Sequence, residues 1–168
     1  MWYAVQIMSG NEDLVQDLCR KMIDPNLLKQ CFYLQYEASY KKQGIRKLIN
    51  KVLFPGYLFI DTDNIAQVEK QLYKVPELTK VLKVGQTSTP LSQEEQDFIQ
   101  KHSNENHIFT MSKGYMTGDY VKIEEGAFAG YYGKLLHIDR HNRYGIMEVT
   151  MAGRKIQMEF GLEIVRKE

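Results

Sequence analysis

The chain has 168 residues, enough for one medium-sized domain or two small ones. Its formal net charge is only +1, which excludes a strongly basic nucleic-acid binder at the level of the whole chain but leaves room for local basic patches. A strand pattern begins at Trp2 without a leader-like segment before it, and no apolar run approaches the roughly 18 residues of a membrane span. We therefore expect a soluble, cytoplasmic protein that makes no membrane contact, and we expect a monomer.

The first predicted elements are a strand and a helix. Residues 2–8 are rich in aromatic and β-branched side chains, which is typical of a strand. Glu12 and Asp13 then fit the first turn of a helix, where the helix dipole favours acidic side chains. Pro25 ends this helix. Leu14, Leu18 and Met22 recur in this helix at helical spacing, and Val15 and Cys19 flank them.

Further strands and helices alternate up to about residue 101. Residues 30–36 and 57–60 read as strands, a short strand is expected near 81–84, and a helix is expected from about Ile65 to Tyr73. Ser92 and Glu95 have the spacing of a capping box and open a helix that runs to about Lys101. The order predicts an α+β fold, an α/β sandwich whose sheet is mostly antiparallel.

The pattern of apolar and polar residues changes after residue 104. Residues 105–113 are polar and aperiodic and are expected to be a linker. Short apolar runs then alternate with glycine-containing turns, which favours a small all-β barrel of five strands over residues 114–168. The expected strands are Tyr120–Ile123, Gly133–Ile138, Tyr144–Thr150, Lys155–Phe160 and Leu162–Val165.

Several motifs occur in the order of a known family. The C-terminal part is similar to a KOW motif, on residues 118–121, 125–130, 133–134 and 138–139. Near the N-terminus, Trp2-Tyr3-Ala4-Val5 and Phe54-Pro55-Gly56-Tyr57 resemble two hallmarks of the NusG N-terminal (NGN) domain. The ordered set resembles the NusG family of transcription factors. The resemblance implies an NGN domain at residues 1–104, a linker at 105–113 and a KOW (SH3-like) domain at 114–168.

Other residues resemble a subgroup of the family, the specialised NusG paralogs called LoaP. They are residues 111–115, 138–141 and 161–163, and Ala152 stands where the housekeeping factor typically carries an aromatic residue. The resemblance implies an antiterminator that a leader-RNA hairpin recruits to specific operons through the KOW domain. Two alternatives stay open, a housekeeping elongation factor whose KOW barrel contacts proteins such as Rho or a ribosomal protein, and a ribosome-associated KOW protein.

The resemblance also implies a polymerase-binding surface. In the family, the NGN domain grips the clamp helices of the largest subunit of RNA polymerase. The residues that match this surface are Trp2, Tyr3, Phe54, Pro55, Gly56 and Tyr57. Aromatic anchors dominate interface energies, although in strands some of these side chains must pack into the core instead.

Two groups of basic residues are candidates for nucleic-acid contacts. The first is expected to be a flexible hairpin loop near nucleic acid, such as non-template or upstream DNA, and comprises Lys41, Lys42, Arg46, Lys47 and Lys51. The second belongs to the KOW region and comprises Lys134, His137, Arg140, His141, Arg143, Arg154 and Lys155. Within it, the stretch from Arg140 to Tyr144 combines guanidinium groups, an amide and a ring, which suits unpaired RNA bases as well as phosphates. Both groups can alternatively be solvated surface.

The sequence predicts no catalytic, metal or cofactor site. Cys19 and Cys31 lie among apolar residues without redox-motif spacing and are expected to be small buried thiols. His137 and His141 are four residues apart, but they fall on a strand end and a turn without a third ligand at a recognisable spacing. The prediction is a protein that acts by binding and not as an enzyme.

Overall fold

A computed structural model describes residues 1–75, 78–81, 83–84 and 87–167. The chain divides into two compact units. Unit 1 comprises Met1–Tyr33, Phe54–Asp97 and Met151–Arg154. Unit 2 comprises Leu34–Leu53, Phe98–Thr150 and the chain from Lys155 onward.

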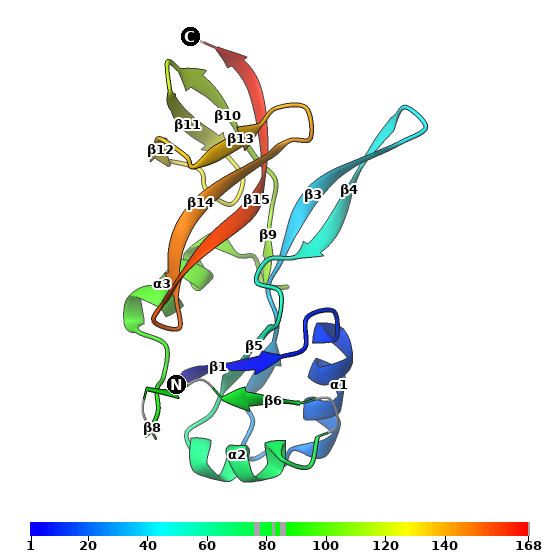
Figure 1. The fold of residues 1–168 in the computed structure, drawn as a ribbon, viewed down its shortest axis with the longest axis vertical. Coiled ribbons are helices and arrows are strands. Elements are labelled where there is room, and N and C mark those ends of the chain that lie inside the picture. Colours follow the sequence, from blue (N-terminus) through cyan, green and yellow to red (C-terminus); the bar gives the residue numbers. More distant parts are fainter. Residues whose placement is uncertain (76–77, 82, 85–86, 168) are drawn as a thin grey trace. The chain divides into compact units, whose positions relative to one another are not determined.

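Unit 1 contains a four-stranded sheet with the strand order β2-β5-β1-β6 (Figure 1). The pairs β1–β5, β1–β6 and β2–β5 are all antiparallel. A separate antiparallel pair is formed by β7 and β8. The elements in chain order are β1 (Trp2–Ile7), α1 (Glu12–Met22), β2 (Gln30–Phe32), β5 (Tyr57–Asp61), α2 (Ile65–Leu72), β6 (Leu78–Val81), β7 (Lys83–Val84) and β8 (Thr87–Ser88). Residue 82, within the short strand expected near 81–84, lies outside the described residues.

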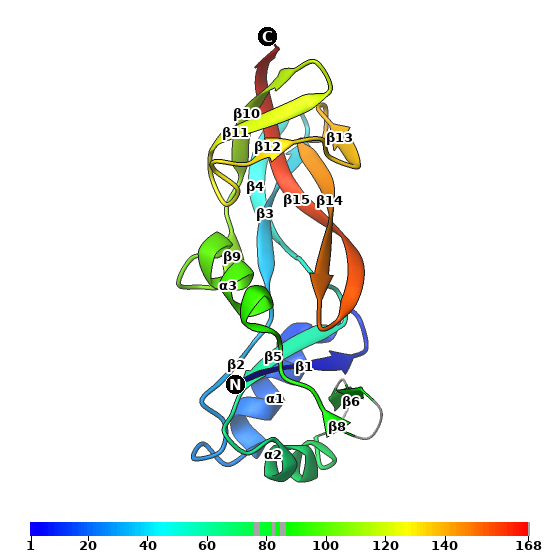
Figure 2. The same cartoon turned by 90° about the vertical axis from the view of Figure 1, so that its left-hand side faces the viewer.

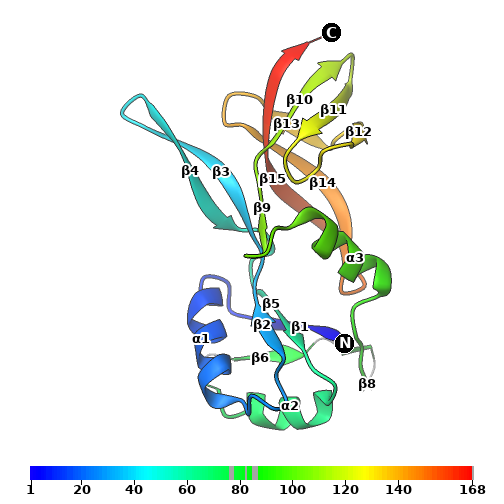
Figure 3. The same cartoon turned by 180° about the vertical axis from the view of Figure 1, so that it is seen from behind.

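The core of unit 1 lies between α1, α2 and one face of this sheet (Figure 3). Alternate residues of a strand face opposite sides. Tyr3, Val5 and Ile7 of β1 therefore face the helices together with Leu58 and Ile60 of β5, and all five belong to one buried cluster. The same cluster holds Cys19 and Cys31, which are buried free thiols, as predicted.

The buried side of α1 differs from the predicted one. Leu14 and Met22 are 50% and 44% exposed, whereas Val15 and Cys19 are fully buried. Ile23, directly after the helix, continues the row of buried residues at a spacing of four. The prediction centred the apolar stripe one residue too early, because five apolar side chains on two adjoining rows leave the orientation of the helix open until the sheet is known.

Unit 2 contains two sheets and the end of α3 (Gln93–His102). The three-stranded sheet has the order β4-β3-β9, formed by β3 (Gln35–Lys42), β4 (Ile45–Val52) and β9 (Ile108–Phe109). The six-stranded sheet has the order β12-β11-β10-β15-β14-β13, and Figure 2 shows β10, β11 and β12 side by side. Its strands are β10 (Ser112–Thr117), β11 (Tyr120–Glu125), β12 (Tyr132–Gly133), β13 (His137–Asp139), β14 (Tyr144–Met151) and β15 (Arg154–Lys167).

The α+β fold class is confirmed, with an all-β C-terminal part. Several details differ from the expected elements. The strand expected over residues 30–36 is divided between β2 and β3, and the strand expected at Gly133–Ile138 is divided between β12 and β13. The last two predicted strands form one continuous strand, β15, and the predicted linker contains β9 and the start of β10. The division into an NGN domain, a linker and a KOW domain stays a prediction. Among the described helices, none is long and apolar enough to cross a membrane.

Candidate functional site

One face of the sheet in unit 1 carries a row of aromatic rings. On β1, β2 and β5 the side chains that point away from α1 and α2 include Trp2, Phe32 and Phe59. The ring centroids of Trp2 and Phe32 are 5.2 Å apart, those of Phe32 and Phe59 are 5.7 Å apart, and Phe54 lies 6.5 Å from Phe59. Such spacings are typical of favourable aromatic pairs.

The Pro55–Gly56 turn beside this row is held by a buried carboxylate. The backbone N–H of Gly56 donates to Oε1 of Glu12 at 2.9 Å, and the N–H of Ile7 donates to the carbonyl of Gly56 at 2.8 Å. Gly56 has φ +84°, and an added Cβ would lie 3.2 Å from the carbonyl oxygen of Ile7. Glycine therefore meets both the backbone conformation and the close approach that the turn requires.

The six predicted polymerase-binding residues differ in exposure. Tyr3 is buried on the helix-facing side of the sheet, Gly56 is buried in the turn, and Phe54 is only 2% exposed. Trp2 and Tyr57 are half-buried and Pro55 is exposed. Arg154, also in unit 1, donates from Nη1 to the hydroxyl of Tyr57 at 3.4 Å. In this conformation the accessible part of the predicted surface is thus formed by Trp2, Pro55 and Tyr57.

In unit 2, the first basic group lies on two paired strands and not in the flexible loop that we expected. The strands β3 and β4 pair along their whole length, from Gln35 opposite Val52 to Lys42 opposite Ile45. The turn consists of Gln43 and Gly44, with φ of 51° and 78°. Positive φ at both central residues is the conformation of the two-residue hairpin turn that matches strand twist. The backbone positions of these cations are therefore fixed along a two-stranded ribbon.

A second ordered turn, residues 139–144, joins β13 to β14. Both oxygens of Asp139 accept hydrogen bonds from Asn142, from its backbone N–H at 2.8 Å and from its side-chain amide at 3.0 Å. These bonds lower the pKa of the Asp139 carboxyl. Arg143 has φ 58°, and its guanidinium lies 3.8 Å from the carboxylate of Glu163. Arg140 and His141 are exposed.

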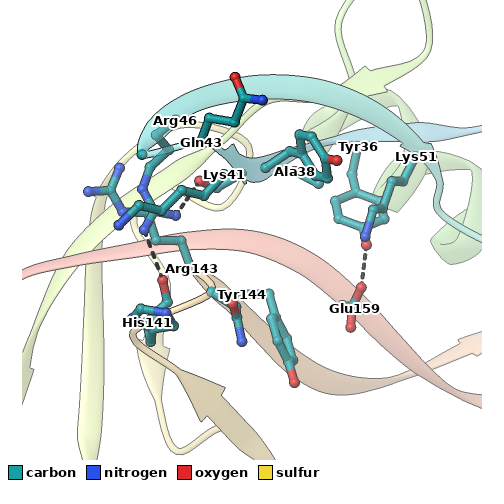
Figure 4. Close-up of a pocket in the computed structure, with 14 residues that line it drawn as sticks. Tyr36, Ala38, Lys41, Gln43, Arg46, Lys51, His141, Arg143, Tyr144 and Glu159 are labelled. Carbon is teal, nitrogen blue, oxygen red and sulfur yellow. Dashed lines mark hydrogen bonds between the residues drawn. The ribbon is translucent and has the colours of Figure 1, made fainter.

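A cleft of about 630 Å³ lies between the hairpin and this turn within unit 2 (Figure 4). Arg46 joins the two walls, because it donates to the hydroxyl of Ser39 at 2.8 Å and to the backbone carbonyl of His141 at 3.3 Å. The residues that line the cleft are Tyr36, Ala38, Ser39, Tyr40, Lys41, Gln43, Gly44, Arg46, Lys51, His141, Asn142, Arg143, Tyr144 and Glu159.

Two close contacts hold the hairpin against the strands of unit 2. The backbone N–H of Met111 donates to the carboxylate of Glu37 at 2.9 Å. At Gly161 on β15, an added Cβ would lie 2.2 Å from the carbonyl oxygen of Glu37. Any side chain at position 161 would therefore push β3 away and change the width of the cleft.

The far end of the cleft contains a tyrosine–carboxylate pair. The hydroxyl of Tyr36 donates to Oε2 of Glu159 (Figure 4). Burial, followed by the bond to Glu159 and its negative charge, raises the pKa of the Tyr36 hydroxyl, so this tyrosine stays protonated and keeps donating. Tyr144 lies in the same wall, and its hydroxyl pKa is raised by burial and then by the charges of Asp139 and Glu159.

The cleft brings together members of both basic groups. Lys41, Arg46 and Lys51 come from the hairpin, and His141 and Arg143 from the turn. Other predicted residues are not among the lining residues: Lys42, Lys47, Lys134, His137, Arg140 and Lys155, with Arg154 in unit 1. Tyr36, Tyr40 and Glu159 were not predicted as site residues from the sequence. The signal for the first two was the alternation of Tyr36, Ala38 and Tyr40 on one face of a strand.

A family model described as "Transcription termination factor nusG" matches residues 1–100 of the chain. This chain belongs to the NusG family. A NusG protein of Halalkalibacterium halodurans, named transcription termination/antitermination protein, is 25% identical over 99% of this chain and 97% of its own length. The protein of the same name from Staphylococcus epidermidis is 28% identical over 99% and 94%.

The fold agrees with a solved member of the family. A NusG structure from Thermotoga maritima matches with a TM-score of 0.57 at 23% sequence identity, covering 97% of this chain and 93% of that chain. The similarity spans nearly the whole of both chains, so the likeness to the NusG fold extends beyond the residues that the family model matches.

Proposed function

We propose that this chain is a NusG-type transcription elongation and antitermination factor. Its NGN part binds the clamp helices of the largest subunit of RNA polymerase and favours the elongating state over paused and termination-prone states. A bound factor shifts such an equilibrium only by its difference in affinity for the two states, so no catalysis is required. Membership of the NusG family and the relatives named transcription termination/antitermination protein support this proposal.

The polymerase-docking surface is formed by the accessible residues at the two ends of the aromatic row, Trp2 at one end and Pro55 and Tyr57 at the other. The half-buried ring of Tyr57 follows the turn that Glu12 holds. A ring on a rigid support loses little conformational entropy when it enters a partner's pocket, which is the usual property of an interface anchor. Phe54 does not contribute to the accessible surface, because its ring is buried against Phe59, but it packs under the turn that precedes Tyr57.

The KOW part recruits the factor to specific operons by binding an RNA hairpin in the leader transcript, as the resemblance to LoaP suggests. The observation that supports RNA binding is the cleft in unit 2, where tyrosine rings lie among four cations. Arg143 comes from the KOW range, and Lys41, Arg46 and Lys51 come from the β3–β4 hairpin, so the hairpin contributes to the site together with the KOW part. Cations and rings in one cleft suit the phosphates and unpaired bases of an RNA loop.

A housekeeping elongation factor is the second candidate function. The full-length similarity to proteins named transcription termination/antitermination protein NusG favours it. The two candidates differ in where the protein acts, since a housekeeping factor is expected at most transcribed genes and a recruited paralog at few operons.

One experiment in cells tests both parts of the proposal. Tagged protein is crosslinked and purified, polymerase in the sample is quantified, and the bound RNA and DNA are sequenced. Tyr57→Ala is expected to reduce polymerase recovery about tenfold or more, because the loss of a central aromatic anchor commonly has such an effect. The matched control is Tyr73→Ala, which removes a tyrosine that is 84% exposed in the same unit.

The outcomes separate the candidates. Undiminished polymerase recovery by folded Tyr57→Ala protein contradicts the docking surface. Enrichment at a few operons with their leader RNA supports the recruited factor, and an even distribution over transcribed genes supports the housekeeping factor instead. Sedimentation with ribosomes and not with polymerase contradicts both.

A further inference from the structure

The cleft in unit 2 has the size and the lining of a site for a single nucleotide. Its volume of about 630 Å³ falls in the range of roughly 300–1,000 Å³ that is usual for small-molecule sites. It is lined by four Lys or Arg side chains and three tyrosines, and one carboxylate, Glu159, stands among them. The carboxylate needs an explanation, because a site that only neutralised phosphates would be weakened by a negative charge.

The cations lie mainly at one end of the cleft. Figure 4 shows Lys41 and Arg46 close to the backbone of His141, with Arg143 on the facing turn. Arg46 is held in place by its bonds to Ser39 and His141, so its guanidinium is oriented before any ligand arrives. A planar guanidinium with fixed orientation is the side chain best suited to a phosphate group.

The other end of the cleft is suited to a base. Figure 4 shows Tyr36, Glu159 and Lys51 there, with Tyr144 between them and the turn. Lys51 is the partner of Tyr36 across the strand pair. Tyrosine rings provide surfaces on which an unpaired base can stack. The bond from the Tyr36 hydroxyl holds Oε2 of Glu159 and leaves the carboxylate only able to accept further hydrogen bonds, because an ionised carboxylate has no donor.

An acceptor-only group discriminates between bases. The Watson–Crick edge of guanine presents two adjacent donors, N1–H and the N2 amino group, which match the two oxygens of a carboxylate. Adenine and cytosine present one amino group beside a ring nitrogen that accepts, and this acceptor would face the carboxylate. Uracil presents one N–H between two carbonyl oxygens. A base that is read in this way must be unpaired, since pairing uses the same edge.

We propose that the cleft binds one unpaired guanosine of an RNA strand, with Glu159 reading the base. Lys41, Arg46 and Arg143 bind the phosphate on one side of this nucleotide, and Lys51, opposite Tyr36, binds the phosphate on the other side. This inference rests on the proposal that the protein binds RNA, and it names the residue that gives the binding its specificity. Glu159 is a specificity-determining residue, and Tyr36 positions it.

The test uses the full chain and short RNA probes. Fluorescence anisotropy measures binding of a short oligouridine and of the same strand with its central residue replaced by G, A or C. The strand with one guanosine is expected to bind about tenfold more tightly than oligouridine, because a good bidentate contact discriminates between bases by roughly five- to 150-fold. Glu159→Gln is expected to abolish this preference and to leave the affinity for oligouridine within about threefold, since no phosphate-binding cation is removed.

Two variants serve as controls. Glu148→Gln removes an exposed carboxylate of β14 that does not line the cleft, and it is expected to keep the guanosine preference. Glu159→Asp keeps the charge but withdraws the carboxylate by one methylene, and it is expected to lose the preference as Glu159→Gln does. Circular dichroism confirms that each variant is folded.

The outcomes distinguish this inference from the proposed function. Equal affinity of the wild-type chain for all four probes, or a guanosine preference that survives in both Glu159 variants, overturns the inference and leaves RNA binding in place. A wild-type chain that binds none of the probes, and no leader RNA in the crosslinking experiment, overturns the RNA-binding proposal itself.

Discussion

Glu12 is buried although it carries a charge, and its hydrogen bonds explain why. Its exposure is 3%, and its carboxylate accepts from the backbone N–H of Gly10 at 3.2 and 3.0 Å and from that of Gly56 at 2.9 Å. The sequence identified Glu12 only as an acid in the first turn of a helix. Its second partner, Gly56, lies 44 residues away in the sequence, and no local sequence pattern predicts such a contact.

Glu12→Ala is expected to lower the free energy of unfolding by about 2 kcal/mol, because it leaves a buried N–H of the Pro55–Gly56 turn without its charged acceptor. The measurement is urea unfolding followed by the fluorescence of Trp2, which is the one tryptophan of the chain and reports on unit 1. The matched control is Asp17→Ala on the exposed side of the same helix, with an expected change below about 0.5 kcal/mol. Equal effects of the two substitutions would show that only the acidic charge of α1 matters.

At the scale of elements, the hairpin β3–β4 shows where a local pattern is misleading. The run of cations from Lys41 to Lys51 without an acid favours an exposed loop, yet every residue except the two of the turn is paired. Tyr40, Ile45 and Leu48 are all exposed, so the hairpin beyond Ala38 lacks the alternation of buried and exposed residues by which strands are recognised. By contrast, the capping box of α3 was predicted correctly, because Ser92 and Glu95 exchange both of their hydrogen bonds locally.

The last turn of α3 makes the stability of unit 2 depend on pH. His102 lies with its Nδ1 2.8 Å from the carbonyl oxygen of Ala127 and its ring 4.7 Å from that of Phe128. Burial lowers the pKa of His102 below its ordinary value of 6.5. The unfolded chain therefore binds the proton more readily than the folded chain. The stability contributed by the neutral ring is complete above pH 6.5 and is lost as the pH falls through that value toward the lowered pKa.

We expect the melting temperature of the wild-type chain to fall when the pH is lowered from about 7.5 to about 5.5, and we expect this fall to be smaller in His102→Gln. Differential scanning calorimetry at both pH values measures the difference between the two proteins, which isolates the contribution of His102. The matched control is His141→Gln, an exposed histidine of the same unit that should keep the wild-type pH dependence. An equal fall in the wild type and in His102→Gln contradicts the argument.

At the scale of the whole molecule, a nearly neutral chain still forms a cationic cleft. The net charge of +1 gives no hint that four Lys or Arg side chains meet in one cleft with a single carboxylate, Glu159. The cleft is assembled from residues 36–51, residues 141–144 and Glu159. The sequence identified the first two stretches as separate sites. It could not show that they meet, because the contacts that join them, such as the bond from Arg46 to His141, link residues 95 positions apart.

The salt dependence of RNA binding tests whether the cleft or the general surface carries the charge contacts. Four Lys or Arg side chains line the cleft. If each neutralises one phosphate of a single strand, the logarithm of the binding constant falls against the logarithm of the salt concentration with a slope of about −3. Lys51→Ala is expected to reduce the magnitude of this slope by about 0.7, measured by anisotropy between about 50 and about 200 mM salt with the guanosine-containing strand.

Lys47→Ala is the matched control, because Lys47 is an exposed lysine of the same strand that does not line the cleft. Both substitutions change the net charge of the chain equally, so long-range attraction alone predicts the same effect for both. If the magnitude of the salt-dependence slope falls in Lys51→Ala and stays unchanged in Lys47→Ala, the phosphates lie in the cleft. Identical slopes for the two variants would instead mean that the strand is attracted by the hairpin as a whole, and the cleft would lose its role as the phosphate site.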